Sequence, residues 1–385
     1  MNTTLSGHAP NNEAGKDMAS FGDSRFKWGI NIDDMWLYAG VQPPKSIIIP
    51  YLLSIRLPRG PIRVAPDSTP MEAIKSATRT VIGKEVVEPG DRAQFSKDLA
   101  GELKTRGVQF VRCWFQWNFF EPKIVDSNPN YQFPLDDFVS TLTSSGIEIV
   151  AVIGNGYSRF LPQGINMRDV SGYLKKLDSS CRAIVRRYKE SIKTWQIENE
   201  PNWWSEHYAT HWRSGGVWLE PTIQDSVLGT LHDLVREEDS SAKIVVNLEA
   251  DHKKTNWKYY AKFADILGLD FYPNYARSSP VDASEVKFSS EVKKQTGLPV
   301  FVAETGYPSG PRIFGYSQGK QVEYVKSAAE ECFSCDDIFA LSPWRYSDSY
   351  WRSFPDQENH FGLFGRDGTP KPAWEEYCNQ IKHKG

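Results

Sequence analysis

The sequence predicts an α/β fold in which eight parallel strands close into one (β/α)8 TIM barrel, with a β-rich insertion after the first strand. Three observations support this prediction. Eight short apolar runs alternate with longer helical patterns, which is the order expected of βα units and a parallel sheet. Glycine precedes several of the runs, where it suits the end of a helix. The 385 residues suffice for one barrel, which needs roughly 250 residues and can exceed 400.

The eight predicted strands are short and mostly apolar, with many β-branched and aromatic residues. In chain order they are Phe26–Ile32, Phe110–Phe115, Glu148–Ile153, Thr194–Asn199, Lys243–Asn247, Ile266–Tyr272, Val300–Glu304 and Ile338–Pro343. Helical patterns between them include Phe95–Thr105, Leu135–Ser144, Gly172–Arg187, Ser226–Glu237 and Gln318–Glu330. Gly107, Gly146 and Gly297 each stand between a helical pattern and a strand, as helix C-caps do. Eight such units favour a closed barrel over an open sheet.

The domain organisation follows from this pattern. Residues 1–23 are polar, lack an apolar signal region and are predicted to form a disordered tail. Residues 24–385 form the barrel, interrupted by an insertion at about 34–94 that contains an apolar stretch and a possible hairpin at Arg59-Gly60. The insertion is interpreted first as a flap packed on the barrel. A lid over the site, an oligomer contact or a membrane-surface contact are the alternatives.

Composition excludes several classes of protein. The net charge is -3 and the basic residues form no long run, which argues against a nucleic-acid partner. The sequence contains no run of 18 apolar residues, so no transmembrane helix is predicted. The chain is therefore expected to be soluble, either cytoplasmic or secreted with its signal peptide absent here; its oligomeric state is not predicted. Cys332 and Cys335 form a CxxC motif without a second pair, so neither a metal nor another cofactor is predicted.

Two carboxylates stand at the ends of predicted strands. Glu200 closes the fourth strand and is followed by Pro201, which can continue neither a ladder nor a helix interior. Glu304 closes the seventh strand after four apolar residues, where an unpaired carboxylate would be costly. Active sites of such barrels lie at the carboxyl ends of the strands, so the two groups can face each other there.

Such a pair suits glycoside hydrolysis. One carboxyl group must be protonated to assist the leaving oxygen, and the other must be ionised to attack the anomeric carbon. Retaining enzymes place the two groups about 5–5.5 Å apart. The predicted partner is therefore a carbohydrate: an oligosaccharide, a polysaccharide or a glycoside.

The motifs Asn199-Glu200-Pro201 and Glu304-Thr-Gly-Tyr-Pro308 resemble those of the clan A glycoside hydrolases. The resemblance spans roughly residues 26–380 and implies a retaining mechanism without a metal. It implies that Glu200 is the general acid/base and Glu304 the nucleophile. It also implies that Asn199 binds the sugar 2-hydroxyl, and it favours a β-linked glycan or glycoside as the substrate.

The same resemblance assigns further positions. Arg112 matches the arginine that supports the nucleophile, Tyr272 the tyrosine that hydrogen-bonds to it, and Trp344 the floor under the reacting sugar. The chain departs from the clan at the third and sixth strands, where many members carry a histidine. Asn155 is the candidate for a polar contact there, and the long first insertion is also atypical.

Aromatic residues make up 13% of the chain and gather near these strand ends. Most rings are expected to pack in the core, but flat rings can also stack on the apolar faces of sugars. The additional candidates for substrate contact are Trp114, Trp203, Trp204, His207 and Arg345.

Several alternatives remain open. Glu198 competes with Glu200, because alternation places it on the same strand face, although its deeper position favours a buried, paired residue. His207 and His211 have metal-ligand spacing without an obvious third ligand. A transglycosylase would use the same site, and a non-catalytic carbohydrate-binding barrel is a further alternative. An aldolase or a metal-dependent hydrolase would need a strand-end lysine or a His/Asp cluster, which these strands lack.

Overall fold

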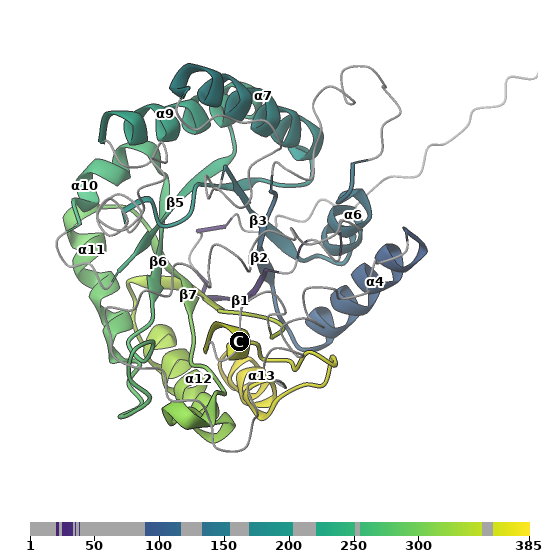
Figure 1. The fold of residues 1–385 in the computed structure, drawn as a ribbon, viewed down its shortest axis with the longest axis vertical. Helices are drawn as coiled ribbons and strands as arrows, with labels where there is room; N and C mark the ends of the chain where they lie inside the picture. Colours follow the sequence, from purple (N-terminus) through teal and green to yellow (C-terminus); the bar gives the residue numbers. More distant parts are fainter. Residues whose placement is uncertain are drawn as a thin grey trace, which may run out of the picture.

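The computed structural model describes residues 21–22, 25–33, 35, 38, 89–116, 133–154, 169–202, 221–250, 255–348 and 357–385. Eight parallel strands form a closed barrel in the order β1-β2-β3-β4-β5-β6-β7-β8. Figure 1 shows the strands at the centre and the helices in a ring around them. The predicted TIM barrel is confirmed.

The strands lie within two residues of their predicted bounds at every end. They are β1 Lys27–Ile32, β2 Phe110–Trp114, β3 Glu148–Ile153, β4 Thr194–Ile197, β5 Lys243–Glu249, β6 Ile266–Phe271, β7 Val300–Thr305 and β8 Ile338–Pro343. All but the first residues of β3 and β5 and one position of β8 are buried, because both faces of a barrel strand are covered.

The helices follow the strands on the outside of the barrel. The α-helices of the described chain are α4 Pro89–Thr105, α6 Asp136–Ser144, α7 Val170–Tyr188, α9 Pro221–Glu238, α10 Trp257–Tyr260, α11 Phe288–Thr296, α12 Gln318–Phe333 and α13 Pro372–Lys384. Four short 3-10 turns accompany them: η5 Ala261–Phe263, η6 Ser284–Lys287, η7 Arg312–Phe314 and η8 Gln357–His360. None of the described helices has both the length and the apolar character that a membrane span requires.

Local sequence signals explain several helix ends. The Asp169 carboxylate accepts the backbone N–H of Gly172 and caps α7, and the Ser317 hydroxyl accepts that of Lys320 at the start of α12. Gly297 ends α11 with a φ of 74°, in the left-handed region that glycine enters without strain. Gly107 and Gly146 both have a φ of 80°, so the predicted glycine caps are confirmed.

The amino-terminal end of the barrel is filled by aromatic rings. Phe21, Phe110 and Phe301 pack edge to face, with ring centroids 5.0 and 5.3 Å from Phe21. Phe21 is 3% exposed, so the predicted disordered tail of residues 1–23 is wrong at its end, because this ring closes the bottom of the barrel. Position 29 must be glycine next to these rings, because a Cβ added at Gly29 would lie 2.3 Å from the Phe110 ring.

The predicted insertion at about 34–94 lies mostly outside the described residues, as do the hairpin at Arg59-Gly60 and residues 1–20 of the predicted tail. Its carboxyl-terminal boundary is corrected, because α4 already begins at Pro89 and not near Phe95.

Candidate active site

Glu304 stands at the carboxyl-terminal end of β7, and its carboxylate is held on both sides. Its Oε1 accepts a hydrogen bond from Arg112 Nη1 at 2.6 Å, and its Oε2 accepts one from the Tyr272 hydroxyl at 2.7 Å. The residue is 4% exposed. Two donors on a buried carboxylate favour its ionised form, so these contacts suit a nucleophile.

Arg112 ties this end of the barrel together. The residue is fully buried in the middle of β2. Its Nε donates to Gln196 Oε1 at 2.6 Å and its Nη1 to Asn31 Oδ1 at 2.7 Å. Its Nη2 donates to Asn199 Oδ1 at 2.6 Å. Together with the bond to Glu304, these contacts link residues of β1, β2 and β7 to β4 and the turn after it, and they orient Asn199.

Glu200 follows β4 in a turn with an unusual backbone. Its φ is 46° and that of Glu198 is 60°, a region that residues other than glycine adopt at a cost of about 1 kcal/mol or more. The backbone N–H of Glu200 donates to Asn247 Oδ1 at 3.2 Å, which anchors the turn to β5. The half-buried side chain brings one carboxylate oxygen within 4.8 Å of oxygens of Asp270 and Glu304.

The prediction that Glu198 shares a face with Glu200 is wrong. The strand ends at Ile197, so the alternation of faces no longer applies to the two residues that follow. A Cβ at Gly154 would lie 2.5 Å from Glu198 Oε1, and the charge of Glu198 acts with burial to raise the pKa of Tyr173 on α7. Glu198 is thus buried between the barrel and α7, as its deeper position suggested.

Three carboxylates converge at the centre of this end. One oxygen atom each from Glu200, Asp270 and Glu304 lies within 4.8 Å of the other two. These are the oxygens in the described chain that could approach a single cation. However, the oxygens of Glu304 are already occupied by Arg112 and Tyr272, and the Arg112 guanidinium supplies positive charge there.

The electrostatics separate the two glutamates. Burial, followed by the charges of Glu304 and Glu249, raises the pKa of Glu200 well above its usual range. Burial also raises the pKa of Glu304, but Arg112 and the Tyr272 hydroxyl act against it. The proton is therefore held more firmly near Glu200, as a general acid requires.

Two tryptophans and an arginine border the carboxylates. The rings of Trp114 and Trp344 pack edge to face at 5.3 Å, and the Arg112 guanidinium lies 4.6 Å from the Trp114 ring centre. Trp114 is 4% exposed, so it supports Trp344 and Arg112, whereas the half-buried Trp344 keeps an accessible surface. Arg345 is buried and pairs with Asp33, so its side chain is engaged in the structure around the site.

Sequence reasoning missed four polar side chains of the site. They lie on the inner face of the barrel and hydrogen-bond to one another or to the predicted residues: Asn31, Gln196, Asn247 and Asp270. Spacing could have found Asp270, because a residue two positions before Tyr272 faces the same side of the strand. The predicted contacts Asn155, Trp203, Trp204 and His207 lie outside the described residues.

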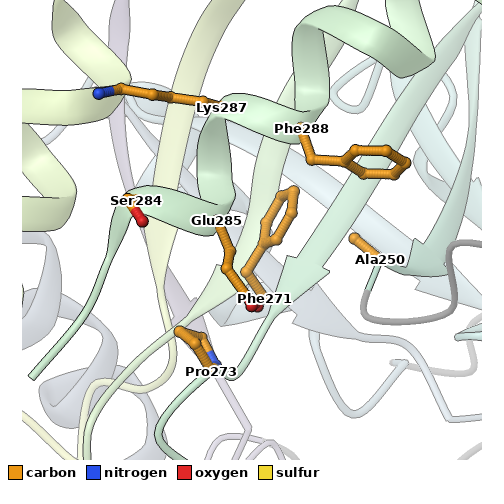
Figure 2. Close-up of a pocket in the computed structure, with 7 residues that line it drawn as sticks. All are labelled: Ala250, Phe271, Pro273, Ser284, Glu285, Lys287 and Phe288. Carbon is orange, nitrogen blue, oxygen red and sulfur yellow. The ribbon is translucent and has the colours of Figure 1, made fainter. Parts of the chain in front are cut away.

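A separate pocket of about 720 Å³ opens on the outer face of β6. Figure 2 shows Phe271 and Phe288 beside it, with Ala250 from the end of β5 and Glu285 from η6. Residue 271 faces this pocket, whereas its neighbours Asp270 and Tyr272 reach the carboxylate cluster. None of the described residues that line the pocket belongs to the predicted site.

Solved structures with a similar fold include glycoside hydrolases of clan A, so the predicted resemblance is confirmed at the level of the fold. GH5_18 from Streptomyces cattleya, in complex with GlcNAc, has a TM-score of 0.62 and 14% identity over 93% of this chain and 80% of that one. The family 1 β-glucosidase from Thermotoga maritima has a TM-score of 0.60 and 14% identity over 94% and 98%. A Bacteroides uniformis β-glucuronidase has a TM-score of 0.56 and 18% identity over 77% and 33%. No family model and no curated protein sequence matches the chain.

Proposed function

We propose that the protein is a retaining glycoside hydrolase that cleaves a β-linked glycan or glycoside by double displacement. The observation that carries this proposal is a pair of carboxylates, one in the turn after β4 and one on β7, with oxygens of Glu200 and Glu304 within 4.8 Å of each other. Retaining enzymes separate the two groups by about 5–5.5 Å, whereas inverting enzymes need roughly 6.5–9.5 Å to admit a water molecule.

In the first step, Glu304 Oε attacks the anomeric carbon while protonated Glu200 gives its proton to the glycosidic oxygen. The glycosidic bond breaks, the leaving group departs as an alcohol, and a glycosyl ester forms on Glu304. Arg112 and Tyr272 hold the attacking carboxylate in place, and Asn199, oriented by Arg112, is positioned for the sugar 2-hydroxyl. Trp344 supplies the floor of the sugar site.

In the second step, Glu200 is a carboxylate and takes a proton from water. The resulting hydroxide attacks the anomeric carbon, and the ester bond to Glu304 breaks. Glu304 carries no charge while it is esterified, so one of the two charges that raise the pKa of Glu200 is absent at that stage. Glu200 can therefore serve as an acid first and as a base later.

The test is a screen of nitrophenyl glycosides and polysaccharides with four proteins: wild type, Glu304→Gln, Glu200→Gln and Glu148→Gln. The panel includes β-mannosides, β-glucosides and β-glucuronides, since related folds include a protein solved with Manb1-4GlcNAc, a β-glucosidase and a β-glucuronidase. We expect Glu304→Gln to lose on the order of 10⁴-fold or more in kcat. Glu148→Gln is the matched control, because Glu148 pairs with Lys27 at the opposite end of the barrel.

Two results would overturn the proposal. Near-normal turnover by Glu304→Gln would exclude this nucleophile, and sugar binding without any hydrolysis would indicate a non-catalytic barrel. Nuclear magnetic resonance can identify which anomer of the sugar is released first, and this tests whether the anomeric configuration is retained. Product analysis at high acceptor concentration distinguishes hydrolysis from transglycosylation on the same site.

A further inference from the structure

Tyr275 is an exposed aromatic residue in the loop that follows β6, at the end of the barrel that holds the carboxylates. The residue is 36% exposed. Its ring centre lies 6.4 Å from that of Tyr272, whose hydroxyl donates to Glu304 Oε2. An exposed aromatic surface therefore lies directly beside the ring that holds the proposed nucleophile.

The Tyr275 ring is held in place by the structure around it. It stacks on the buried Phe361, with ring centres 6.3 Å apart and ring planes 19° apart. The backbone N–H of Tyr275 donates to Tyr272 O at 2.9 Å, and the Tyr316 hydroxyl donates to Tyr275 O at 2.7 Å. The buried Asn274 amide bonds three further backbone groups of the same loop. A ring that is already fixed loses little conformational freedom when a ligand packs on it.

The order of the strands places Tyr275 on the leaving-group side of the site. β7, which carries Glu304, pairs with β6 on one side and with β8 on the other. Trp344, the proposed floor of the reacting sugar, directly follows β8, so that sugar lies on the β8 side of Glu304. The bond that breaks is at the anomeric carbon beside Glu304. The leaving group therefore extends away from the reacting sugar, toward β6 and Tyr275.

The surroundings of Tyr275 suit a sugar better than an apolar leaving group. The next two residues, Ala276 and Arg277, are also exposed, so this part of the loop is open to water. Apolar groups are bound mostly in enclosed, apolar clefts. A pyranose ring can pack an apolar C–H face on an aromatic ring and keep its hydroxyl groups in water.

We propose that Tyr275 binds the first sugar unit of the leaving group, so that the substrate is a β-linked oligosaccharide or a longer glycan and not a glycoside of an apolar alcohol. This inference rests on the proposed function, in which the bond that breaks lies beside Glu304. The Tyr275 ring packs on the C–H face of the leaving sugar and makes no bond to the reacting atoms. It acts on the affinity for that sugar and on its orientation toward Glu200.

The test compares Tyr275→Ala with the wild type on two kinds of substrate: cellotriose and β-1,4-mannotriose, and the β-fluorides of glucose and mannose. A fluoride leaving group has no ring to pack on Tyr275. We expect kcat/KM to fall about tenfold for the trisaccharides, as for loss of one aromatic contact, and to stay at the wild-type value for the fluorides. Tyr275→Phe keeps the ring and should behave like the wild type.

Phe333→Ala is the matched control. Phe333 is 38% exposed, and its ring contacts two others, those of Phe26 and Trp28, at the amino-terminal end of the barrel. Equal losses of Tyr275→Ala on trisaccharides and fluorides would show a merely structural role and overturn the inference. Cleavage of fluorides and aryl glycosides, but of no oligosaccharide or polysaccharide in the screen, would show an apolar leaving group and also overturn it.

A binding measurement separates failure of this inference from failure of the proposed function. Isothermal titration calorimetry of the screened glycans with Glu304→Gln requires no hydrolysis. Adding Tyr275→Ala to Glu304→Gln should weaken binding about tenfold, whereas adding Phe333→Ala should leave it unchanged. Unchanged binding with Tyr275→Ala, or no binding of any screened glycan before that substitution, would overturn the inference. Absence of hydrolysis by the wild type would overturn the proposed function and leave this measurement to decide the role of Tyr275.

Discussion

The two ends of the barrel are built from the same eight strands and differ in the side chains that these strands turn inward. At the amino-terminal end the interior is apolar and aromatic, with Phe21, Phe110, Phe301 and Phe339 in contact. At the carboxyl-terminal end the interior holds three carboxylates, an arginine and several amides. One end excludes water by packing rings, and the other buries charges.

This difference teaches where stability and chemistry come from. Burial of a phenylalanine contributes about 1.5–3 kcal/mol from the hydrophobic effect alone. A buried ion pair such as Arg112–Glu304 contributes little net stability, because desolvation offsets most of the attraction. The aromatic end therefore stabilises the barrel, and the polar end uses that stability to hold charged groups in a fixed geometry.

The largest effect on stability and activity is expected from Arg112→Met, which tests the role of the buried charges at the carboxyl-terminal end of the barrel. The substitution leaves Glu304 buried without its cation, so the free energy of unfolding should fall by about 3–5 kcal/mol. The value of kcat should fall on the order of 10³-fold. Chemical denaturation and steady-state kinetics measure the two effects. Arg236→Met, which removes a half-exposed ion pair with Asp265, should change both far less.

Phe110→Ala tests the aromatic end. The ring is fully buried against Phe21 and Phe301, and its loss should reduce the free energy of unfolding by about 3–5 kcal/mol. Well below the melting temperature, kcat/KM should stay at the wild-type value. A folded variant that had lost its activity would show that the two ends are coupled, contrary to the comparison.

Tyr272→Phe tests how much a single hydrogen bond to Glu304 contributes at the carboxyl-terminal end of the barrel. It removes one of the two donors to Glu304 and keeps the ring that packs 5.6 Å from Phe361. A hydrogen bond to a charged group is worth about 1.5–3 kcal/mol, so kcat/KM should fall about tenfold to hundredfold. Tyr377→Phe is the control, because its hydroxyl donates to Gly29 O, away from the carboxylates. Equal losses in both variants would contradict the assigned contact.

The smallest effect is a gain in stability from Glu200→Gln. The folded-state pKa of Glu200 is raised, first by burial and then by Glu304, so the native state keeps a proton that the unfolded state releases above about pH 4.3. Wild-type stability should therefore fall as pH rises from that value toward the folded-state pKa. Glutamine does not titrate, so the variant should gain on the order of 1 kcal/mol toward neutral pH. Urea denaturation at several pH values measures this, and a difference independent of pH would refute the cause.

The fold could be predicted because barrel strands are short, apolar and regularly spaced. The errors occurred where the chain leaves that regular pattern. The left-handed backbone of Glu198 redirects a side chain that strand alternation would place beside Glu200. Phe21 lies in a polar stretch, yet its ring is buried against Phe110 and Phe301. Nothing in the sequence near Phe21 indicates these distant partners.

The site could be predicted only in part, for a related reason. Strand-end glutamates stand out against apolar runs, and the resemblance supplied Arg112, Tyr272 and Asn199. Asn31, Gln196 and Asn247 look like ordinary polar residues within strands, since their importance depends on partners 81, 84 and 47 residues away. Closure of the barrel creates those contacts, and closure cannot be inferred from any single strand.

Asn31 links the closure of the barrel, where β1 meets β8, to the support of Arg112. The ladder between β1 and β8 pairs only Lys27 with Ala340 and Trp28 with Leu341. Beyond it, the Asn31 amide nitrogen donates to Ser342 O at 2.9 Å, while its oxygen accepts from Arg112. The first and last strands thus meet through the same side chain that steadies the guanidinium. Until β1 and β8 pair, Asn31 cannot bond to both Ser342 and Arg112, and the guanidinium that holds Glu304 lacks this support. Closing the barrel therefore also completes the support of the carboxylate.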